Sequence, residues 1–295
     1  MYWNGYCLYA LMCFTTALPH LNKGAGSCSY FKSEDVNKKS LVIDVMKLEM
    51  NPKECLTHGP FNTILIHALG SKTENTPISF SVESIEYEHL IVLNNAMPVN
   101  FCPLCGKGTM IATSLTVFKN DNLQTWSWLE CTKFKYIRID SCGFQRFQNQ
   151  ETNNLILSEN LLTLTLVNID NFDPWNDLNY LNAPNLRELS ISYFQFIFLE
   201  TKRTAVFPRL KRLNLRNNRI MDMEKDFFQF MPQLDEINLE GNLLKNIDLT
   251  FELKPGKLIL DDNPLEGDEE TCNFLETASF VDYPRKSQIC QKNKD

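Results

Sequence analysis

Four cysteines could do chemistry in this chain: Cys102, Cys105, Cys131 and Cys142. The spacing Cys102-Pro-Leu-Cys105 is that of a redox-active pair, which needs a strand before it and a helix after it to lower the thiol pKa. Together with Cys131 and Cys142 the pair could instead hold zinc, but the long spacing between the last two is not that of a zinc knuckle. We therefore favour a structural disulfide over either active site.

Other candidates for catalysis or metal binding are sparse. The chain has only 4 His, and no Gly-x-Ser-x-Gly sequence occurs that would indicate a serine hydrolase. His67 and His89 fall about four strand positions apart in the repeat pattern described below, roughly 13 Å, too far to share one metal ion. The acidic run at 266–270 lacks the alternating ligands of a calcium loop and suits a solvated helix start. We expect no enzyme activity, no metal and no other cofactor.

Composition and charge limit the possible partners and the compartment. The 295 residues carry a net charge of −7, which is unfavourable for binding nucleic acid or an anionic membrane. Ten Cys are typical of a secreted protein. The apolar, uncharged segment 6–18, followed by small residues before Cys28, predicts a signal peptide over residues 1–27; a buried N-terminal strand or helix is the alternative. We expect a secreted, extracellular protein without membrane insertion.

An internal repeat runs through most of the chain. Segments 210–220 and 234–244 both read Leu-x-x-Leu/Ile-x-Leu-x-x-Asn-x-Leu/Ile and lie 24 residues apart. Between them, Phe227 and Phe230 are expected to face the core. The same frame gives about nine repeats over residues 61–265, with starts at Phe61, Tyr87, Ala112, Phe134, Leu161, Leu186, Leu210, Leu234 and Pro255. We expect Leu41–Val45 to form the first, capping strand.

The pattern has a direct physical meaning. Alternating apolar residues line one face of a short strand, and the Asn is buried to bond backbone groups in the turn that follows. One repeat cannot bury its apolar face alone, so neighbouring repeats stack into a continuous core. The motif resembles the leucine-rich repeat of extracellular proteins, over nearly all of the chain after residue 27. The resemblance implies an α/β solenoid with a curved parallel sheet on its concave face.

Caps and disulfides are expected at both ends. Residues 266–295 resemble the C-terminal cap of extracellular leucine-rich repeats, with a helix beginning near Asp268 and a disulfide between Cys272 and Cys290. Residues 28–60 would form the N-terminal cap, with Cys28 and Cys55 flanking the first strand. Equivalent positions in adjacent repeats can bridge, so we favour Cys105–Cys131, with Cys102–Cys131 and Cys102–Cys105 as alternatives.

The outward rows of the predicted sheet are the candidate binding site. In the early repeats they hold apolar residues, namely Leu65, Ile91, Leu93 and Phe118. In the later repeats they are mostly polar and charged and include Tyr136, Arg138, Arg212 and Arg216. Exposed apolar residues on a concave surface indicate a contact site. A frame shifted by one residue would place the early ones in the core instead. Arg212 and Arg216 are flanked by acids, so pairing within the sheet and partner recognition both remain open.

The function implied is recognition. Short two-cysteine caps and degenerate early repeats resemble the insect leucine-rich immune proteins, in a form without the coiled coil. This resemblance implies a secreted, non-enzymatic module that binds a protein ligand or a glycan-bearing surface in innate immunity. The alternatives are an extracellular structural or matrix protein that packs against itself, including as a dimer, and a disulfide-handling enzyme at Cys102 and Cys105.

Overall fold

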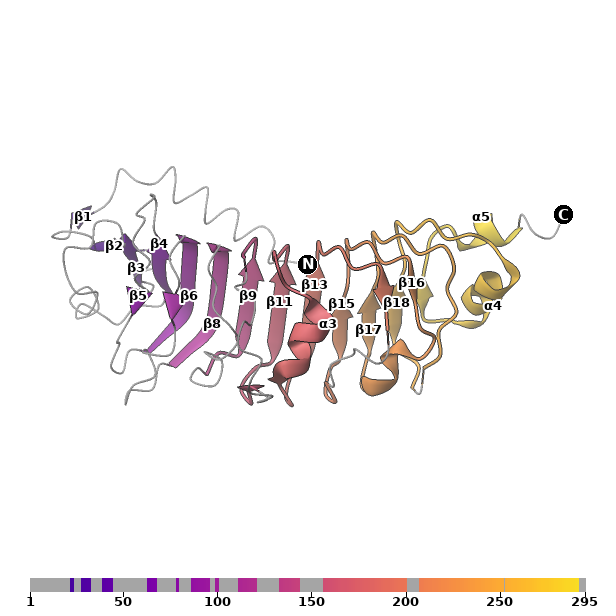
Figure 1. The fold of residues 1–295 in the computed structure, drawn as a ribbon, viewed down its shortest axis with the longest axis horizontal. Coiled ribbons are helices and arrows are strands. Elements are labelled where there is room, and N and C mark those ends of the chain that lie inside the picture. The colour runs from indigo at the N-terminus through magenta and orange to yellow at the C-terminus, as the bar shows by residue number, and fades with distance from the viewer. Residues whose placement is uncertain are drawn as a thin grey trace.

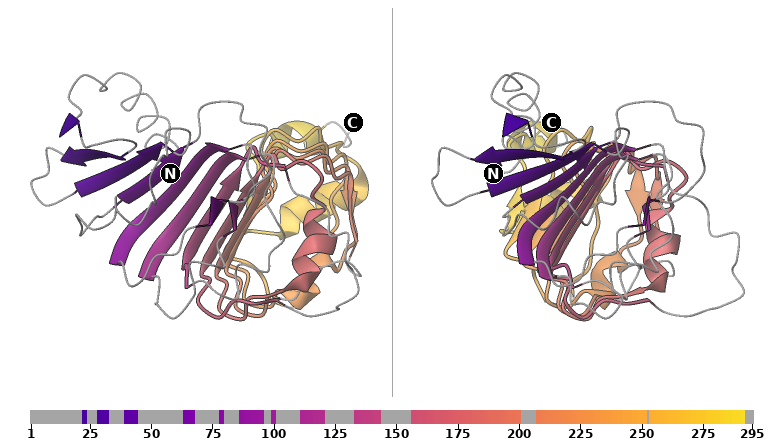
Figure 2. Two further views of the ribbon diagram at one scale, coloured as in Figure 1. Left: turned by 60° about the vertical axis from the view of Figure 1, so that its left-hand side comes forward. Right: turned by 90° about the vertical axis from the view of Figure 1, so that its left-hand side faces the viewer.

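The computed structural model describes residues 133–143, 156–200, 207–251 and 253–291, and the strands of the chain before residue 133. The strands lie side by side in one long row, which runs from the N-terminal strands at one end of Figure 1 to the C-terminal helices at the other. The returning segments lie on the opposite side of the coil from this row (Figure 2). The molecule is therefore an elongated solenoid.

One sheet of 13 strands forms the wall of the solenoid. Its strands, in spatial order, are β1 (Asn22–Lys23), β2 (Cys28–Lys32), β3 (Lys39–Asp44), β4 (Thr63–His67), β6 (Glu86–Asn95), β8 (Ile111–Asn120), β9 (Tyr136–Asp140), β11 (Thr163–Val167), β13 (Glu188–Ser192), β15 (Arg212–Asn214), β17 (Glu236–Asn238), β18 (Lys257–Ile259) and β19 (Val281–Asp282). From β3 onward every neighbouring pair is parallel.

The N-terminal end of this sheet differs from the expectation that Leu41–Val45 is its first strand. Most of that segment lies in β3, but β1 and β2 precede it, and β2 pairs with β3 in the antiparallel sense. An antiparallel neighbour needs only a short connection, whereas a parallel one needs a complete repeat. The hairpin also covers the backbone groups that β3 would otherwise present at an open edge.

The repeat frame read from the sequence is correct in the described strands. Burial alternates along β9, β11 and β13, with apolar side chains facing inward at every second position. In β8, Leu115 and Val117 are fully buried while Thr116 and Phe118 are half-buried. A shift by one residue would reverse these positions, so the alternative frame is wrong at β8.

Short elements form the returning side of the coil. They are the paired strands β5 (Ile78–Ser79) with β7 (Val99–Asn100), β10 (Ile156–Leu157) with β12 (Leu181–Asn182) and β14 (Phe198–Leu199) with β16 (Asp222–Met223), the helix α3 (Pro174–Asp177), and the 3-10 helices Leu178–Tyr180 and Phe227–Phe230.

The expectation that Phe227 and Phe230 both face the core is half wrong. Phe227 is buried, but Phe230 is 41% exposed, and Phe228 is buried instead. Phe228 stacks on Phe251 with ring centroids 5.5 Å apart and meets Phe227 edge to face. The 3-10 helix ends at Phe230, and Met231 occupies the next interior position.

Buried asparagines connect successive repeats. The Asn242 amide donates to the carbonyls of Leu239 in its own repeat and Leu215 in the preceding one, at 2.8 and 2.9 Å. Its oxygen accepts from the backbone of Ile220. Asn218 and Asn263 make the equivalent bonds in their own repeats. Each asparagine therefore satisfies backbone groups of two neighbouring turns that water cannot reach.

A compact cap closes the C-terminal end. Helix α4 (Glu269–Thr277) begins after Asp268, whose side chain accepts a hydrogen bond from Thr271 N at 2.7 Å, as an N-cap should. The buried Thr271 hydroxyl in turn accepts from Ile247 of the last repeats. Helix α5 (Lys286–Gln291) follows, and a disulfide joins Cys272 to Cys290. The cap thus covers the apolar edge that the final repeat would expose.

Candidate functional site

The concave face is the outward side of the 13-stranded sheet, opposite the core. Its side chains form three rows because the parallel strands pair without offset. In the described part, the first row is Ser114, Tyr136, Thr163, Glu188, Arg212, Glu236 and Lys257. The central row is Thr116, Arg138, Thr165, Ser190, Asn214, Asn238 and Ile259. The third row begins with Phe118, Asp140, Val167 and Ser192 and continues past the strand ends to Arg216, Glu240 and Asp261.

The predicted early apolar residues fall in these rows. Leu65 pairs with Ile91 and, through Ile91, with Thr116 in the central row. Leu93 pairs with Phe118 in the third row. Phe118 is half-buried, and the ammonium of Lys119 lies 5.4 Å from its ring centroid. The backbone register therefore brings the four predicted positions into two adjacent rows of three neighbouring strands.

The arginines of the later repeats bind carboxylates of the sheet itself. Arg138 lies 2.5 Å from Asp140, and Arg216 lies 2.9 Å from Glu240 in the next repeat. Arg212 forms an ion pair with Glu188 on the preceding strand. Of the two readings left open by the sequence, the structure therefore shows pairing within the sheet. Tyr136 is different, because it is 44% exposed and lies next to Ser114 and Thr163 in the first row.

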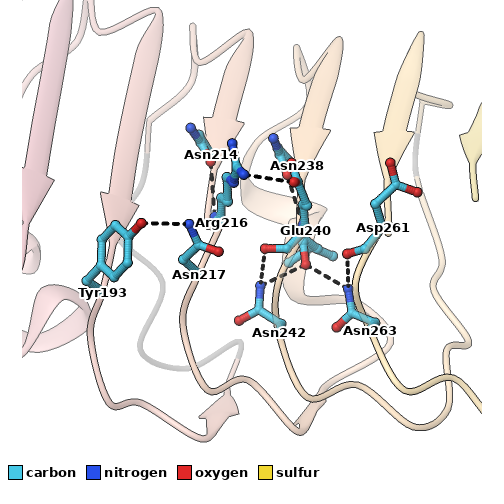
Figure 3. A network of polar contacts seen from close by, with 10 residues as sticks. Tyr193, Asn214, Arg216, Asn217, Asn238, Glu240, Asn242, Asp261 and Asn263 are labelled. Atoms are coloured by element: carbon cyan, nitrogen blue, oxygen red, sulfur yellow. Dashed lines mark hydrogen bonds and ion pairs between the residues drawn. The ribbon is translucent and has the colours of Figure 1, made fainter. Parts of the chain in front are cut away.

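A shallow hollow lies in the middle of the later concave face. It offers about 180 Å³ and is lined by Thr163, Thr165, Glu188, Leu189, Ser190, Arg212, Leu213, Asn214, Glu236 and Asn238. Its floor is the central row, where Asn214 and Asn238 accept hydrogen bonds from the backbone of Arg216 and Glu240 at 3.0 and 2.9 Å (Figure 3). Neutral hydroxyl and amide groups thus line a depression flanked by ion pairs.

The C-terminal end of the concave face has an excess of carboxylates. Burial raises the pKa of Asp261, and the neighbouring Asp282 and Asp262 raise it further, while Lys257 and Arg285 act in the opposite direction. Asp261 Oδ1 is buried without a hydrogen-bond partner among the described residues. Lys257 is engaged with Asp282 at 3.2 Å. The local field there disfavours a further negative charge.

Two further candidates from the sequence are the acidic run at 266–270 and the pair of histidines. The acidic run belongs to the cap, where Asp268 starts α4, Glu266 pairs with Lys245 and Glu270 pairs with Lys225. His89 lies 2.6 Å from Ser114, and the register separates it from His67 by four positions, as expected.

The structure describes only some of the cysteines for which the sequence predicts disulfides. Cys142 is buried at the asparagine position, and its sulfur lies 3.2 Å from the Asp140 carbonyl. Cys55, Cys102, Cys105 and Cys131 lie outside the described residues, and Cys28 is described only as part of the backbone of β2. The pairs Cys28–Cys55 and Cys105–Cys131, with their alternatives, remain predictions.

Neither a metal centre nor a spanning helix is found in the part of the chain that the structure describes. Within those residues, no three or more His, Cys, Asp or Glu side chains gather as metal ligands would. Over the same residues, no helix has the length and apolar character needed to cross a bilayer.

Three residues of the concave face were not singled out by sequence reasoning. Asn214 and Asn238 occupy the middle position of the Leu-x-Leu or Ile-x-Leu triplet, and the repeat frame alone could have identified them. Tyr193 follows β13 with a positive φ of 64° and is 58% exposed. Aligning it with Lys119, Ser141, Asn217 and Gly241, none of which is aromatic, would have marked Tyr193 as unusual.

One comparison with known families agrees with this architecture, since residues 208–254 match the family described as Leucine rich repeat. The crystal structure of the mouse RP105/MD-1 complex contains a chain that is similar at 13% sequence identity with a TM-score of 0.36. That similarity covers 84% of this chain and 54% of the mouse chain, so this chain spans about half of the other's length.

Proposed function

Because the chain folds as a leucine-rich-repeat solenoid, we propose that it is a secreted, non-enzymatic recognition module that binds a protein ligand through its concave face in innate immunity. Solenoids of this kind present an extended curved surface rather than an enclosed cleft, and such surfaces suit macromolecular partners. The apolar N-terminal segment supports secretion, and the acidic composition argues against nucleic acid as the ligand.

The observation that carries the proposal is the outward position of Phe118. Its neighbours Leu115 and Val117 fill the core, so Phe118 is not needed there, and its ring lies on the concave face beside the register position of Leu93. Aromatic residues on such surfaces commonly supply a large share of binding energy. We therefore place the main contact on the early strands, around Leu65, Ile91, Leu93 and Phe118.

Affinity capture from extracellular fluid with the intact protein tests this proposal. The captured protein is identified, and its Kd is then measured for the wild type and for Phe118→Ala. We expect the substitution to weaken binding about tenfold or more, since truncating an apolar anchor commonly costs about 1–3 kcal/mol. Because Phe118 is not part of the core, the melting temperature should change little.

Phe198→Ala is the matched control. Phe198 is 43% exposed in β14, on the returning side of the coil, so its truncation should leave both binding and melting unchanged. A large fall in the stability of Phe118→Ala would place that ring in the core. Unchanged stability together with unchanged affinity would exclude the early concave strands as the binding site.

Secretion has a separate test. The full chain is expressed in a secretory cell line and the N-terminus of the protein in the medium is sequenced. We expect a mature chain that begins close to Cys28, between about residues 18 and 28, the range where small residues follow the apolar segment. Retention inside the cell with Met1 in place would contradict the proposed compartment.

A further inference from the structure

We propose that the later half of the concave face carries a second contact site, which binds an extended segment of a partner protein through a lysine or arginine side chain. The site is the hollow described above, with Asn214 and Asn238 on its floor and Glu236 beside them in the first row. It rests on the proposed function, since both assume a protein ligand on the concave face. It lies several strands away from Phe118 and can be tested independently.

Beside the hollow, the carboxylate of Glu236 lies outside the ion pairs of the first row. Arg212 lies between Glu188 and Glu236 in the first row, and its guanidinium pairs with Glu188. On the other side of Glu236, Lys257 pairs with Asp282. Among the residues that the structure describes, no ion pair includes Glu236.

Further carboxylates lie at this end of the face. Asp282 and Asp262 are close enough to Asp261, at the end of the third row, to raise its pKa, although burial raises that pKa more. A cation from a partner would therefore meet a favourable field, whereas an anion would be repelled.

The floor of the hollow supplies hydrogen-bond donors. The side-chain oxygens of Asn214 and Asn238 are engaged by backbone N–H groups of their own strand ends, so their amide NH2 groups remain to face the hollow. The two residues pair directly across β15 and β17, which places them about 4.8 Å apart. Peptide carbonyls are the acceptors that an extended segment of protein carries along its length, so these donors suit a peptide backbone.

The experiment measures binding of synthetic peptides to the intact protein by fluorescence anisotropy. The peptides are acetylated, amidated and labelled, and alternate Ser and Gly around one central residue, which is Arg, citrulline or Glu. Citrulline keeps the shape of arginine without its charge. We expect the Arg peptide to bind about tenfold more tightly than the citrulline peptide, and the Glu peptide to bind most weakly.

Two variants and one control locate the effect. Glu236→Gln should abolish the preference for Arg over citrulline. Asn238→Ala should weaken binding of all three peptides to a similar degree, because it removes a hydrogen-bond donor to the peptide backbone and leaves the charge of the site unchanged. Glu266→Gln, an exposed acid of the cap that pairs with Lys245, should leave the preference intact.

The inference is overturned if the three peptides bind alike, or if Glu236→Gln retains the preference for Arg. Its failure is distinguishable from failure of the proposed function. Loss of the captured partner on Phe118→Ala, combined with peptides that bind alike, removes the second site and leaves the proposed function standing.

Discussion

Single asparagines hold the turns of this solenoid, and their removal should be costly. Asn218 and Asn242 are buried, and each bonds carbonyls of two repeats and one backbone N–H. We expect Asn218→Ala and Asn242→Ala each to lower the free energy of unfolding by about 1–3 kcal/mol, because the buried backbone groups lose their partners. Chemical denaturation measures the change. Asn273→Ala, at an exposed position of α4, is the control and should change stability little.

Asp261 should make stability depend on pH in a defined direction. Its pKa in the folded state is raised above the ordinary 3.8 by burial first and by Asp282 and Asp262 next. The folded state then binds the proton more tightly than the unfolded state, so stability is lost as pH rises from 3.8 through the raised pKa. Asp261→Asn removes this loss. We expect the variant to melt higher than the wild type at pH 7, and the difference to close as pH falls toward 3.8.

The measurement is thermal unfolding of both proteins across that pH range. Asp262→Asn, one residue further along and exposed, is the matched control and should have a smaller effect. A wild type that is more stable than Asp261→Asn at pH 7 would contradict the sign of the argument.

At the scale of elements, the cap depends on a covalent link between its two helices. The Cys272–Cys290 disulfide closes a sequence separation of 18 residues. Removing a link over a loop of this size costs about 3 kcal/mol in the chain-entropy account. We expect the double variant Cys272→Ser, Cys290→Ser to unfold at lower denaturant concentration. Peptide mapping without reductant should recover the linked pair, and free thiols at both positions would show that the link does not form.

The docking of α5 depends on a glycine. A side chain at Gly267 would place its Cβ 2.1 Å from the backbone oxygen of Ile289, which cannot move without displacing the helix. Gly267→Ala should therefore destabilise the cap by about 1–3 kcal/mol. At Gly256 the nearest atom is the side-chain oxygen of Asp235, which can turn away, so Gly256→Ala should cost less. Equal melting temperatures for the two variants would show that α5 is not held at this contact.

For the whole molecule, the sequence predicted the wall of the solenoid better than its other side. The Leu-x-Leu frame identified the strands, because alternation along a strand and stacking between repeats impose the same pattern on every repeat. It failed at Phe230, because a single 3-10 turn has no period long enough to reveal its buried face. It also missed the hairpin of β1 and β2, since those strands repeat nothing.

The candidate site was predictable in outline only. The rows of the concave face followed from the repeat frame, including the positions of Phe118 and Arg212. The choice of Glu188 as the partner of Arg212 did not, because Glu236 flanks it equally in the sequence pattern and only side-chain geometry distinguishes the two. Tyr193 was not recognised, since its backbone conformation is set by the turn and not by its own residue type.

The strands stay in register although the segments between them differ in length. The connection from β15 to β17 is longer than that from β17 to β18, yet Leu213, Ile237 and Leu258 remain opposite one another. The returning side absorbs the difference. Insertions and deletions in the connections are therefore separable from substitutions on the concave face: the first kind of change alters the outline of the molecule, and the second alters what it recognises. A lineage of such proteins can vary either property while the other is inherited unchanged.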